Sequence, residues 1–209
     1  MDNKTHRRGE QTRQRILDAA EALFAEKDYS AARLEDVAQA VGIRRASIVY
    51  YFAGKQELYE AMEQRIFSAM MAHTQRAERP DAPAMDQLLA LLDGWLDFLV
   101  GRPTAARILL RISANSYSDS SAPVRNSFVA LGAWEDIIRR GQASGEFVAA
   151  SSAHLLHLLG AGTIYYSATG QLLGDERNYN PAAPDQLQAF RRLMHRSARA
   201  LLSPGQGRS

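Results

Sequence analysis

The 209-residue sequence contains no cysteine, which excludes disulfide bonds, thiolate metal sites and cysteine nucleophiles. Its 7 prolines and 14 glycines are too few for a collagen-like or low-complexity chain. The first residues lack the apolar stretch of a secretory signal peptide, so we expect a cytoplasmic protein. Alternating apolar runs that would indicate a strand are also missing.

Charged residues are missing from Val148 to Gly174, a length that raises the question of a membrane span. Strongly apolar side chains are a minority in this segment, however, and polar ones such as His154, His157 and Thr163 interrupt them. Such a helix is better suited to burial against protein than to lipid. We therefore expect no membrane partner.

Apolar residues recur near the helical period along most of the chain, which predicts an all-α fold of nine helices. Thr12 is expected to cap the first of them. The expected helices span about residues 12–27, 33–41, 45–51, 55–75, 85–100, 103–115, 122–140, 151–173 and 184–202.

Basic residues are concentrated near the start, although the net charge is only +2. Residues 1–55 hold ten Lys and Arg against eight Asp and Glu, and the remaining chain is balanced. The basic tail, residues 1–11, fits either a nucleic-acid-binding arm or a solvated, disordered terminus.

Two short expected helices joined through Gly42 have the pattern of a helix-turn-helix. Val37, Ala38 and Val41 are placed to face the second helix, and Gly42 stands where a positive φ is often needed. A plain helical hairpin with a solvated face would show the same pattern. If the motif binds DNA, the side chains of the second helix that are left to contact base edges or phosphates are those of Arg44, Arg45, Ser47, Tyr50 and Tyr51.

Five motifs occur in order across this region: Ile16 to Phe24, Asp36 to Ala38, Val41 to Ile43, Tyr50 to Phe52 and Lys55 to Leu58. With them, the stretch from Thr12 to Met62 resembles the N-terminal domain of the tetracycline-repressor (TetR) family of bacterial transcriptional regulators. The motifs cover about a quarter of the chain, and the remainder agrees with the family in helix number and length.

The resemblance implies a helix-turn-helix head over residues 1–54 and a ligand-binding and dimerisation domain over residues 55–209. It further implies a repressor that binds a palindromic double-stranded DNA operator as a homodimer. A small hydrophobic or aromatic effector would release it. The residues assigned to DNA binding are Thr12, Arg33, Arg44, Arg45, Ser47, Tyr50, Tyr51 and Lys55.

Two departures from the family pattern concern the same surface. Val49 replaces a tyrosine that often contacts phosphate, and Arg44 replaces the usual serine cap of the recognition helix. Arg33 and Arg44 are candidates for replacement phosphate contacts. Lys55 stands where a lysine at the start of the fourth helix reaches DNA in the family, which agrees with the preference of helix N-termini for phosphates.

The larger domain is rich in aromatic side chains, accompanied by methionines and two histidines, which suits an apolar pocket with a few polar groups. Its last two expected helices carry apolar stripes and small residues that a two-fold partner would cover as a four-helix bundle. The expected pocket residues are Phe67, Met71, Trp95, Phe98, Phe128, Trp134, His154, His157 and Tyr165. The expected dimer residues are Gly160, Ala161, Thr163, Phe190, Met194 and Leu201.

Catalytic motifs are missing: there is no G-x-S-x-G, no P-loop and no Rossmann glycine pattern. His154 and His157 have the spacing of two metal ligands on one helix, yet no nearby acidic residue completes a site. We therefore expect neither an enzyme nor a metal or other cofactor. The alternatives to the regulator are a helical small-molecule-binding protein without DNA function and a small-molecule enzyme.

Overall fold

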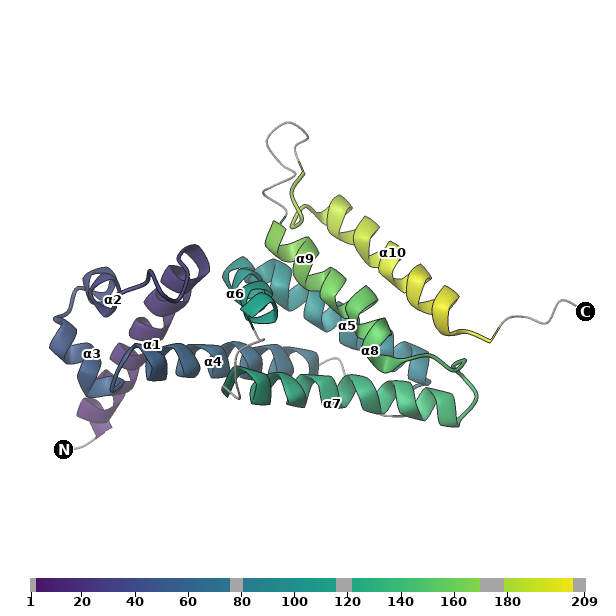
Figure 1. The fold of residues 1–209 in the computed structure, drawn as a ribbon, viewed down its shortest axis with the longest axis horizontal. Coiled ribbons are helices and arrows are strands. Elements are labelled where there is room, and N and C mark those ends of the chain that lie inside the picture. The colour runs from purple at the N-terminus through teal and green to yellow at the C-terminus, as the bar shows by residue number, and fades with distance from the viewer. Residues whose placement is uncertain (1–2, 76–80, 116–121, 170–178, 205–209) are drawn as a thin grey trace, which may run out of the picture. The chain divides into compact units, whose positions relative to one another are not determined.

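The computed structural model describes residues 3–75, 81–115, 122–169 and 179–204 (Figure 1). Every regular element in these residues is a helix, which confirms the expected all-α class. They are α1 (Asn3–Glu26), α2 (Leu34–Val41), α3 (Arg45–Tyr51), α4 (Lys55–Gln75), α5 (Ala84–Gly101), α6 (Pro103–Asn115), α7 (Ala122–Ala143), α8 (Ser152–Leu155), the π-helical stretch η1 (Leu156–Gly160), α9 (Ala161–Thr169) and α10 (Pro184–Leu202).

The chain divides into two compact units, which we call the head (residues up to Ile66) and the C-terminal unit (from Phe67). This division lies inside α4, whereas the sequence suggested a boundary at the start of that helix. None of the helices in the described ranges is long and apolar enough to cross a bilayer.

The first helix begins earlier than expected. It starts at Asn3, and Thr12 does not cap it, because its Oγ1 donates a hydrogen bond to the Arg8 carbonyl at 3.0 Å. The expected start at Thr12 is therefore wrong. Residues 4–11 include Lys, Arg, Glu and Gln, which favour helix, but they are polar and produce no apolar period that marks a helix in the sequence.

Apolar residues between the starts of α1 and α4 and along these helices form the core of the head, and the largest are at most 3% exposed. The largest of them are Ile16, Leu17, Phe24, Ile48, Phe52, Leu58 and Met62. Two ion pairs from Arg65 on α4 reach Asp18 at 2.6 Å and Glu21 at 3.0 Å on α1. A third contact, from Arg15 Nη2 to the Val41 carbonyl at 2.6 Å, holds the end of α2 against α1.

Gly42 makes the turn between α2 and α3. Its φ of 74° lies in the left-handed region, as expected, and its backbone N–H bonds to the carbonyls at the end of α2. The next N–H, of Ile43, donates to the Ala38 carbonyl at 3.0 Å. Val37, Ala38 and Val41 are buried, also as expected. The backbone reversal at Gly42 therefore sets the direction of α3.

In the C-terminal unit the expected helix over 151–173 is, in its described part, a run of three pieces: α8, η1 and α9. The Ala161 N–H bonds to the Leu156 carbonyl, five residues back, so η1 is one widened turn. Side chains satisfy nearby carbonyls: Thr163 Oγ1 donates to Gly160 at 2.7 Å, and His157 Nδ1 lies 2.7 Å from the Ala153 oxygen. The widened turn shifts which residues face each side of the helix.

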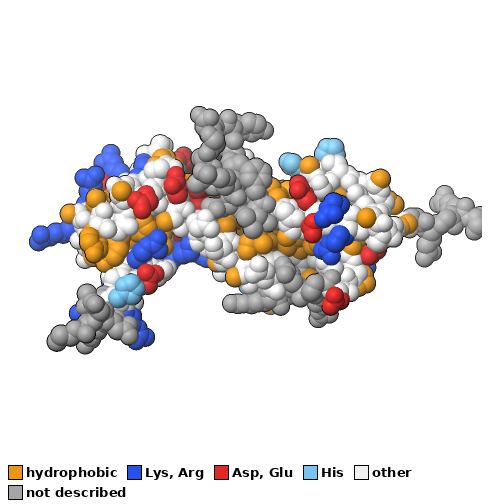
Figure 2. All heavy atoms as spheres, turned by 90° about the horizontal axis from the view of Figure 1, so that it is seen from below, with side chains coloured by type: hydrophobic (Ala, Val, Ile, Leu, Met, Phe, Trp, Pro, Cys, Tyr) orange, Lys and Arg blue, Asp and Glu red, His pale blue; other side chains and the backbone are white. Residues whose placement is uncertain are grey.

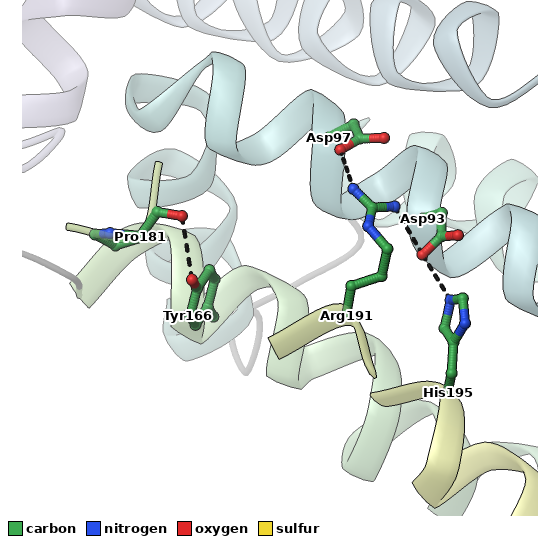
Figure 3. A network of polar contacts seen from close by, with 6 residues as sticks. All are labelled: Asp93, Asp97, Tyr166, Pro181, Arg191 and His195. Atoms are coloured by element: carbon green, nitrogen blue, oxygen red, sulfur yellow. Dashed lines mark hydrogen bonds and ion pairs between the residues drawn. The ribbon is translucent and has the colours of Figure 1, made fainter. Parts of the chain in front are cut away.

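Helix α10 lies beside α5 and η1 in the C-terminal unit (Figures 1 and 3). Arg191 on α10 contacts Asp93 at 2.9 Å and Asp97 at 2.5 Å on α5, and His195 Nε2 donates to Asp93 at 2.8 Å (Figure 3). Because Arg191 is only 16% exposed, this pairing is better shielded from solvent than a surface ion pair. It fixes the rotation of α10 about its own axis.

Glu63 on α4 is a buried carboxyl group. The residue is 0% exposed, and neither carboxylate oxygen has a hydrogen-bond partner among the described residues. Burial raises the pKa of Glu63 to about 7, and the negative charge of Glu60 acts in the same direction. The head therefore contains a carboxyl group that titrates near neutral pH.

Replacing Gly42 by alanine tests the turn. The added Cβ meets nothing within 4 Å, so the cost is that of a left-handed backbone, about 1–2 kcal/mol in the free energy of unfolding. Urea denaturation followed by circular dichroism measures it. Gly54→Ala is the control, because its Cβ is equally free and its φ is not positive. Equal losses in both variants would contradict the argument.

Glu63→Gln tests the buried carboxyl. Because its folded-state pKa is raised, the contribution of Glu63 to wild-type stability should be complete below about pH 4.5 and be lost as the pH rises through 7. The variant removes that loss, so it should exceed wild type by about 1–3 kcal/mol at pH 8 and by little at pH 4.5. Urea denaturation at both pH values measures this. Glu10→Gln, on the exposed part of α1, should show no such pH dependence; a pH-independent Glu63→Gln would refute the prediction.

Candidate functional site

The outer face of α3 combines basic, aromatic and apolar side chains. Tyr50 is 84% exposed and Val49 47% exposed, while Ile48 on the opposite face is buried in the head. Arg44 and Arg45 are exposed as well, and Tyr51 is half-buried with its ring 5.1 Å from that of Tyr50. Figure 2 shows Lys and Arg side chains projecting from the head on the face drawn.

Arg45 forms an ion pair with Glu35 of α2, with Nε 2.9 Å from Oε1. Both side chains are largely exposed, at 62% and 59%, so the pair contributes little stability and is easily exchanged. Arg45 is thus held across the helix-turn-helix without being buried. Its guanidinium remains available for the bidentate geometry that guanine offers.

Lys55 is engaged within the head. Its Nζ donates to the carbonyls of Tyr29 at 2.7 Å and Ala32 at 3.1 Å, and lies 4.4 Å from the centroid of the Tyr29 ring. The ammonium group therefore holds the segment between α1 and α2 against the start of α4. A DNA phosphate would have to share it with these carbonyls.

The remaining predicted contacts differ in their surroundings. Ser47 is half-buried on α3, and Arg33 is exposed at the residue that precedes α2. Neither Arg33 nor Arg44 makes a side-chain cap for the helix that follows it. Thr12, half-buried, is occupied with the Arg8 carbonyl. Arg33, Arg44, Arg45 and Tyr50 thus have exposed side chains, whereas Thr12 and Lys55 have hydrogen-bond partners within the head.

The C-terminal unit contains a cavity of about 310 Å³. The described residues that line it include no Asp, Glu, Lys or Arg. They come from α4, α5, α6, α7, η1 and α9: Phe67, Met70, Trp95, Leu99, Leu109, Ile112, Ser113, Leu131, Leu156, His157, Gly160, Ala161, Thr163 and Ile164. The size is at the lower end of the range of small-molecule pockets.

Three of the expected pocket residues, Phe67, Trp95 and His157, line this cavity. Trp134 does not, but its ring stacks on that of Trp95 with centroids 5.9 Å apart. The other expected residues are outside its lining: Met71 is half-buried, Phe98 is buried, and His154 and Tyr165 are exposed. Phe128 lies on α7 among residues whose side chains fall outside the described part.

Sequence reasoning missed the aliphatic part of the lining. Leu109, Ile112, Leu156 and Ile164 carry no polar or aromatic signal that separates a pocket wall from ordinary core. The His154 and His157 pair does not form a metal site with neighbours: the described residues contain no group of three or more potential ligands.

The expected dimer residues fall on two different faces. Gly160, Ala161 and Thr163 line the cavity, and Gly160 and Thr163 are buried inside their own unit. Their burial leaves them little surface for a partner copy, and their place in a dimer interface stays a prediction. The π-helical turn at η1, invisible in the sequence, is what shifts these residues toward the cavity side.

The other three expected residues, Phe190, Met194 and Leu201, line an open apolar groove of about 380 Å³ between η1, α9 and α10, which we call the α10 groove. Leu158 and Leu193 line it too and are 60% and 51% exposed. Phe190 also stacks on Tyr166, with ring centroids 4.0 Å apart. The groove thus presents large apolar side chains to solvent.

Comparison with known proteins finds sequence relatives of the head. Residues 16–62 match the family model described as bacterial regulatory proteins, tetR family. The HTH-type transcriptional regulator SrpR of Pseudomonas putida is 39% identical over 62 residues, 30% of this chain and 29% of its own. IcaR of Staphylococcus aureus (strain Newman), a negative regulator of the biofilm operon icaADBC, is 44% identical over 46 residues, 22% of this chain and 25% of its own.

These curated relatives are matched over less than a third of their length. A solved tetR-family regulatory protein from Rhodococcus RHA1 extends the likeness in fold, with a TM-score of 0.74 at 16% identity over 92% of this chain and 98% of its own. The sequence match of the head and the shared fold of both units agree. The head thus matches the tetR family of bacterial regulatory proteins in sequence, and the chain shares the fold of a solved member of that family.

Proposed function

We propose that this chain is a transcriptional repressor that binds a palindromic DNA operator as a homodimer and is released by a small apolar effector. The observation that carries the proposal is the solvent-facing surface of α3. This seven-residue helix buries Ile48 and exposes Arg45 and Tyr50, with the exposed Arg44 directly before it. A short helix with such a face is suited to placing side chains in a major groove. SrpR and IcaR, the relatives that match the head, carry the names of transcriptional regulators.

Each exposed group on α3 has a distinct use on DNA. Arg45 suits a guanine edge once it leaves Glu35, and Arg44 and the Tyr50 hydroxyl suit phosphates. Val49 presents a small apolar surface that fits a thymine methyl. Lys55 acts first as a clamp on the carbonyls of Tyr29 and Ala32, so we assign it to positioning the head.

A second copy of the chain is the proposed occupant of the α10 groove. Leu158, Leu193 and Leu201 are large, apolar and at least 40% exposed, and they lie together on one side of η1 and α10. Exposed apolar patches of this kind mark interaction surfaces. A two-fold axis through the groove would cover both copies at once, and a dimer presents two heads to two half-sites.

The helical run from α8 to α9 links the effector to the dimer in this proposal. Gly160 and Thr163 lie on its cavity side, and Leu158 and Gly162 lie on its groove side. A ligand that favours one position of this run would change the groove and with it the spacing of the two heads. Effector and operator affinities would then be reciprocally coupled.

Operator binding tests the proposal directly. Sites are selected from random duplex DNA with the full chain, and affinities are measured by fluorescence anisotropy. Arg45→Ala should cost about 1–3 kcal/mol per half-site and relax the preference at one base pair. Glu35→Gln should keep that preference and tighten binding, since it frees Arg45 and removes a negative charge.

Arg139→Ala is the matched control, because Arg139 is also exposed and ion-paired but lies on α7. It should leave operator affinity unchanged. A selection that returns no enriched sequence would favour the helical small-molecule-binding protein instead. Enrichment with an unaffected Arg45→Ala would show that α3 does not read the bases.

Leu193→Glu tests the dimer. A carboxylate buried against a partner copy without a counterion should cost several kcal/mol and leave a monomer of 23.1 kDa at micromolar concentration. Light scattering gives the mass. Gln188→Glu adds the same charge to α10 outside the α10 groove and should remain dimeric. A monomeric wild type, or a dimeric and folded Leu193→Glu, would refute this interface.

A further inference from the structure

The first turns of α1, residues 3–11, which we call the arm, lie outside the core of the head. Among the side chains that the structure describes, Ile16 is the first of α1 to be buried, whereas His6, Arg7 and Arg8 are exposed. Most of the stability of a helix in a protein comes from packing of one of its faces. The arm is helical without such packing in the head, so its surface is open to a partner.

Positive charge is concentrated in and beside the arm. Residues 1–15 hold five Lys and Arg against two Asp and Glu, a net charge of +3, whereas the net charge of the whole chain is +2. Glu10, the acidic residue of the arm, accepts a hydrogen bond from Gln14 at 2.7 Å. Within the described part of the chain, the guanidinium groups of Arg7 and Arg8 have no ion pair or hydrogen bond. These two cations are therefore available to an anionic partner.

Two contacts within the head fix the direction of the arm. Arg15 Nη2 donates to the Val41 carbonyl at 2.6 Å, where α2 ends, and the Arg13 guanidinium lies 5.0 Å from the centroid of the Phe52 ring, where α3 ends. Residues seven apart lie on nearly the same face of a helix, so Arg8 follows Arg15 about 10 Å further along α1. In Figure 1 the start of α1 accordingly extends past α3. The arm thus carries positive charge beyond the helix-turn-helix.

We infer that the arm binds duplex DNA as a helix, and that Arg7 and Arg8 contact backbone phosphates beside the bases that α3 reads. Duplex DNA fits this placement because its phosphates continue on both sides of the groove that α3 would enter. The inference rests on the proposed function in taking duplex DNA as the partner. It adds a second DNA contact, outside the helix-turn-helix, that contributes affinity but no sequence preference.

The salt dependence of DNA binding tests the two charges. Fluorescence anisotropy gives the dissociation constant of the full chain for a labelled duplex of arbitrary sequence, at salt concentrations from about 50 to about 200 mM. Each phosphate contact that is lost reduces the slope of log K against log salt by about 0.9. Arg7→Gln/Arg8→Gln should therefore reduce the slope by about 1.8 per bound chain. Its loss of affinity relative to wild type should be about tenfold larger at the lowest salt concentration than at the highest.

Arg139→Gln/Arg140→Gln is the matched control. It removes the same charge from two exposed arginines, but these lie on α7 in the C-terminal unit. The control should keep the wild-type slope. An unchanged slope in Arg7→Gln/Arg8→Gln, or an equal reduction in the control, overturns the inference, and so does a wild type that does not bind the duplex.

Replacement of Gly9 tests the helical form of the arm without changing a charge. A Cβ at Gly9 meets nothing within 4 Å, so Gly9→Ala fits and favours the helix. Gly9→Pro interrupts the helix and with it the rigid link between the two arginines and the head. Gly9→Pro should weaken duplex binding several-fold at low salt and reduce the slope, whereas Gly9→Ala should do neither. Wild-type binding by Gly9→Pro overturns the helical placement.

The results separate the arm from the regulator. A chain that selects an operator, but whose slope is the same in Arg7→Gln/Arg8→Gln, refutes the arm alone. A chain whose duplex binding depends on the arm, yet which enriches no sequence, refutes the regulator alone. Vesicles of phosphatidylglycerol provide a second polyanion. If Arg7→Gln/Arg8→Gln abolishes binding to these vesicles and leaves duplex binding unchanged, DNA is not the partner of the arm.

Discussion

The contact between the Trp95 ring and Gly160 is the constraint on which the arrangement of the C-terminal unit depends. A Cβ at Gly160 would lie 3.1 Å from the Trp95 ring and 2.8 Å from Leu156 Cδ1, so a larger residue would require both side chains to move. The close approach coincides with the widened turn of η1. Together they decide that one face of the helix run borders the cavity while the other borders the α10 groove.

In the head, one set of residues holds the helices together and another set faces solvent. Side-chain contacts within the head, among them the Arg65 ion pairs and the hydrogen bonds of Lys55, fix α1, α2 and the start of α4. The groups on the outer face of α3 are held loosely or not at all, as in the exposed pair of Arg45 and Glu35. Side chains that have only weak contacts within the head can turn to a binding partner, while the fixed helices keep them in position.

Local patterns predicted the head well because its determinants are local. The positive φ at Gly42 and the burial of Val37, Ala38 and Val41 follow from sequence spacing alone. Aromatic content was a poorer guide to the cavity: Trp95 lines it, while Trp134, equally aromatic, packs behind it. Residue type reports that a side chain avoids water, but not whether its neighbour is core or open space.

The sequence by itself determined the helices and the helix-turn-helix, because apolar period and turn chemistry act over a few residues. Only the tertiary structure decided the roles of single side chains. The carbonyls that hold Lys55 come from the segment 29–32, more than twenty residues away in the chain. Among the described residues, Trp95 Nε1 is buried without a hydrogen-bond partner and η1 forms one widened turn, and neither feature has a local sequence pattern.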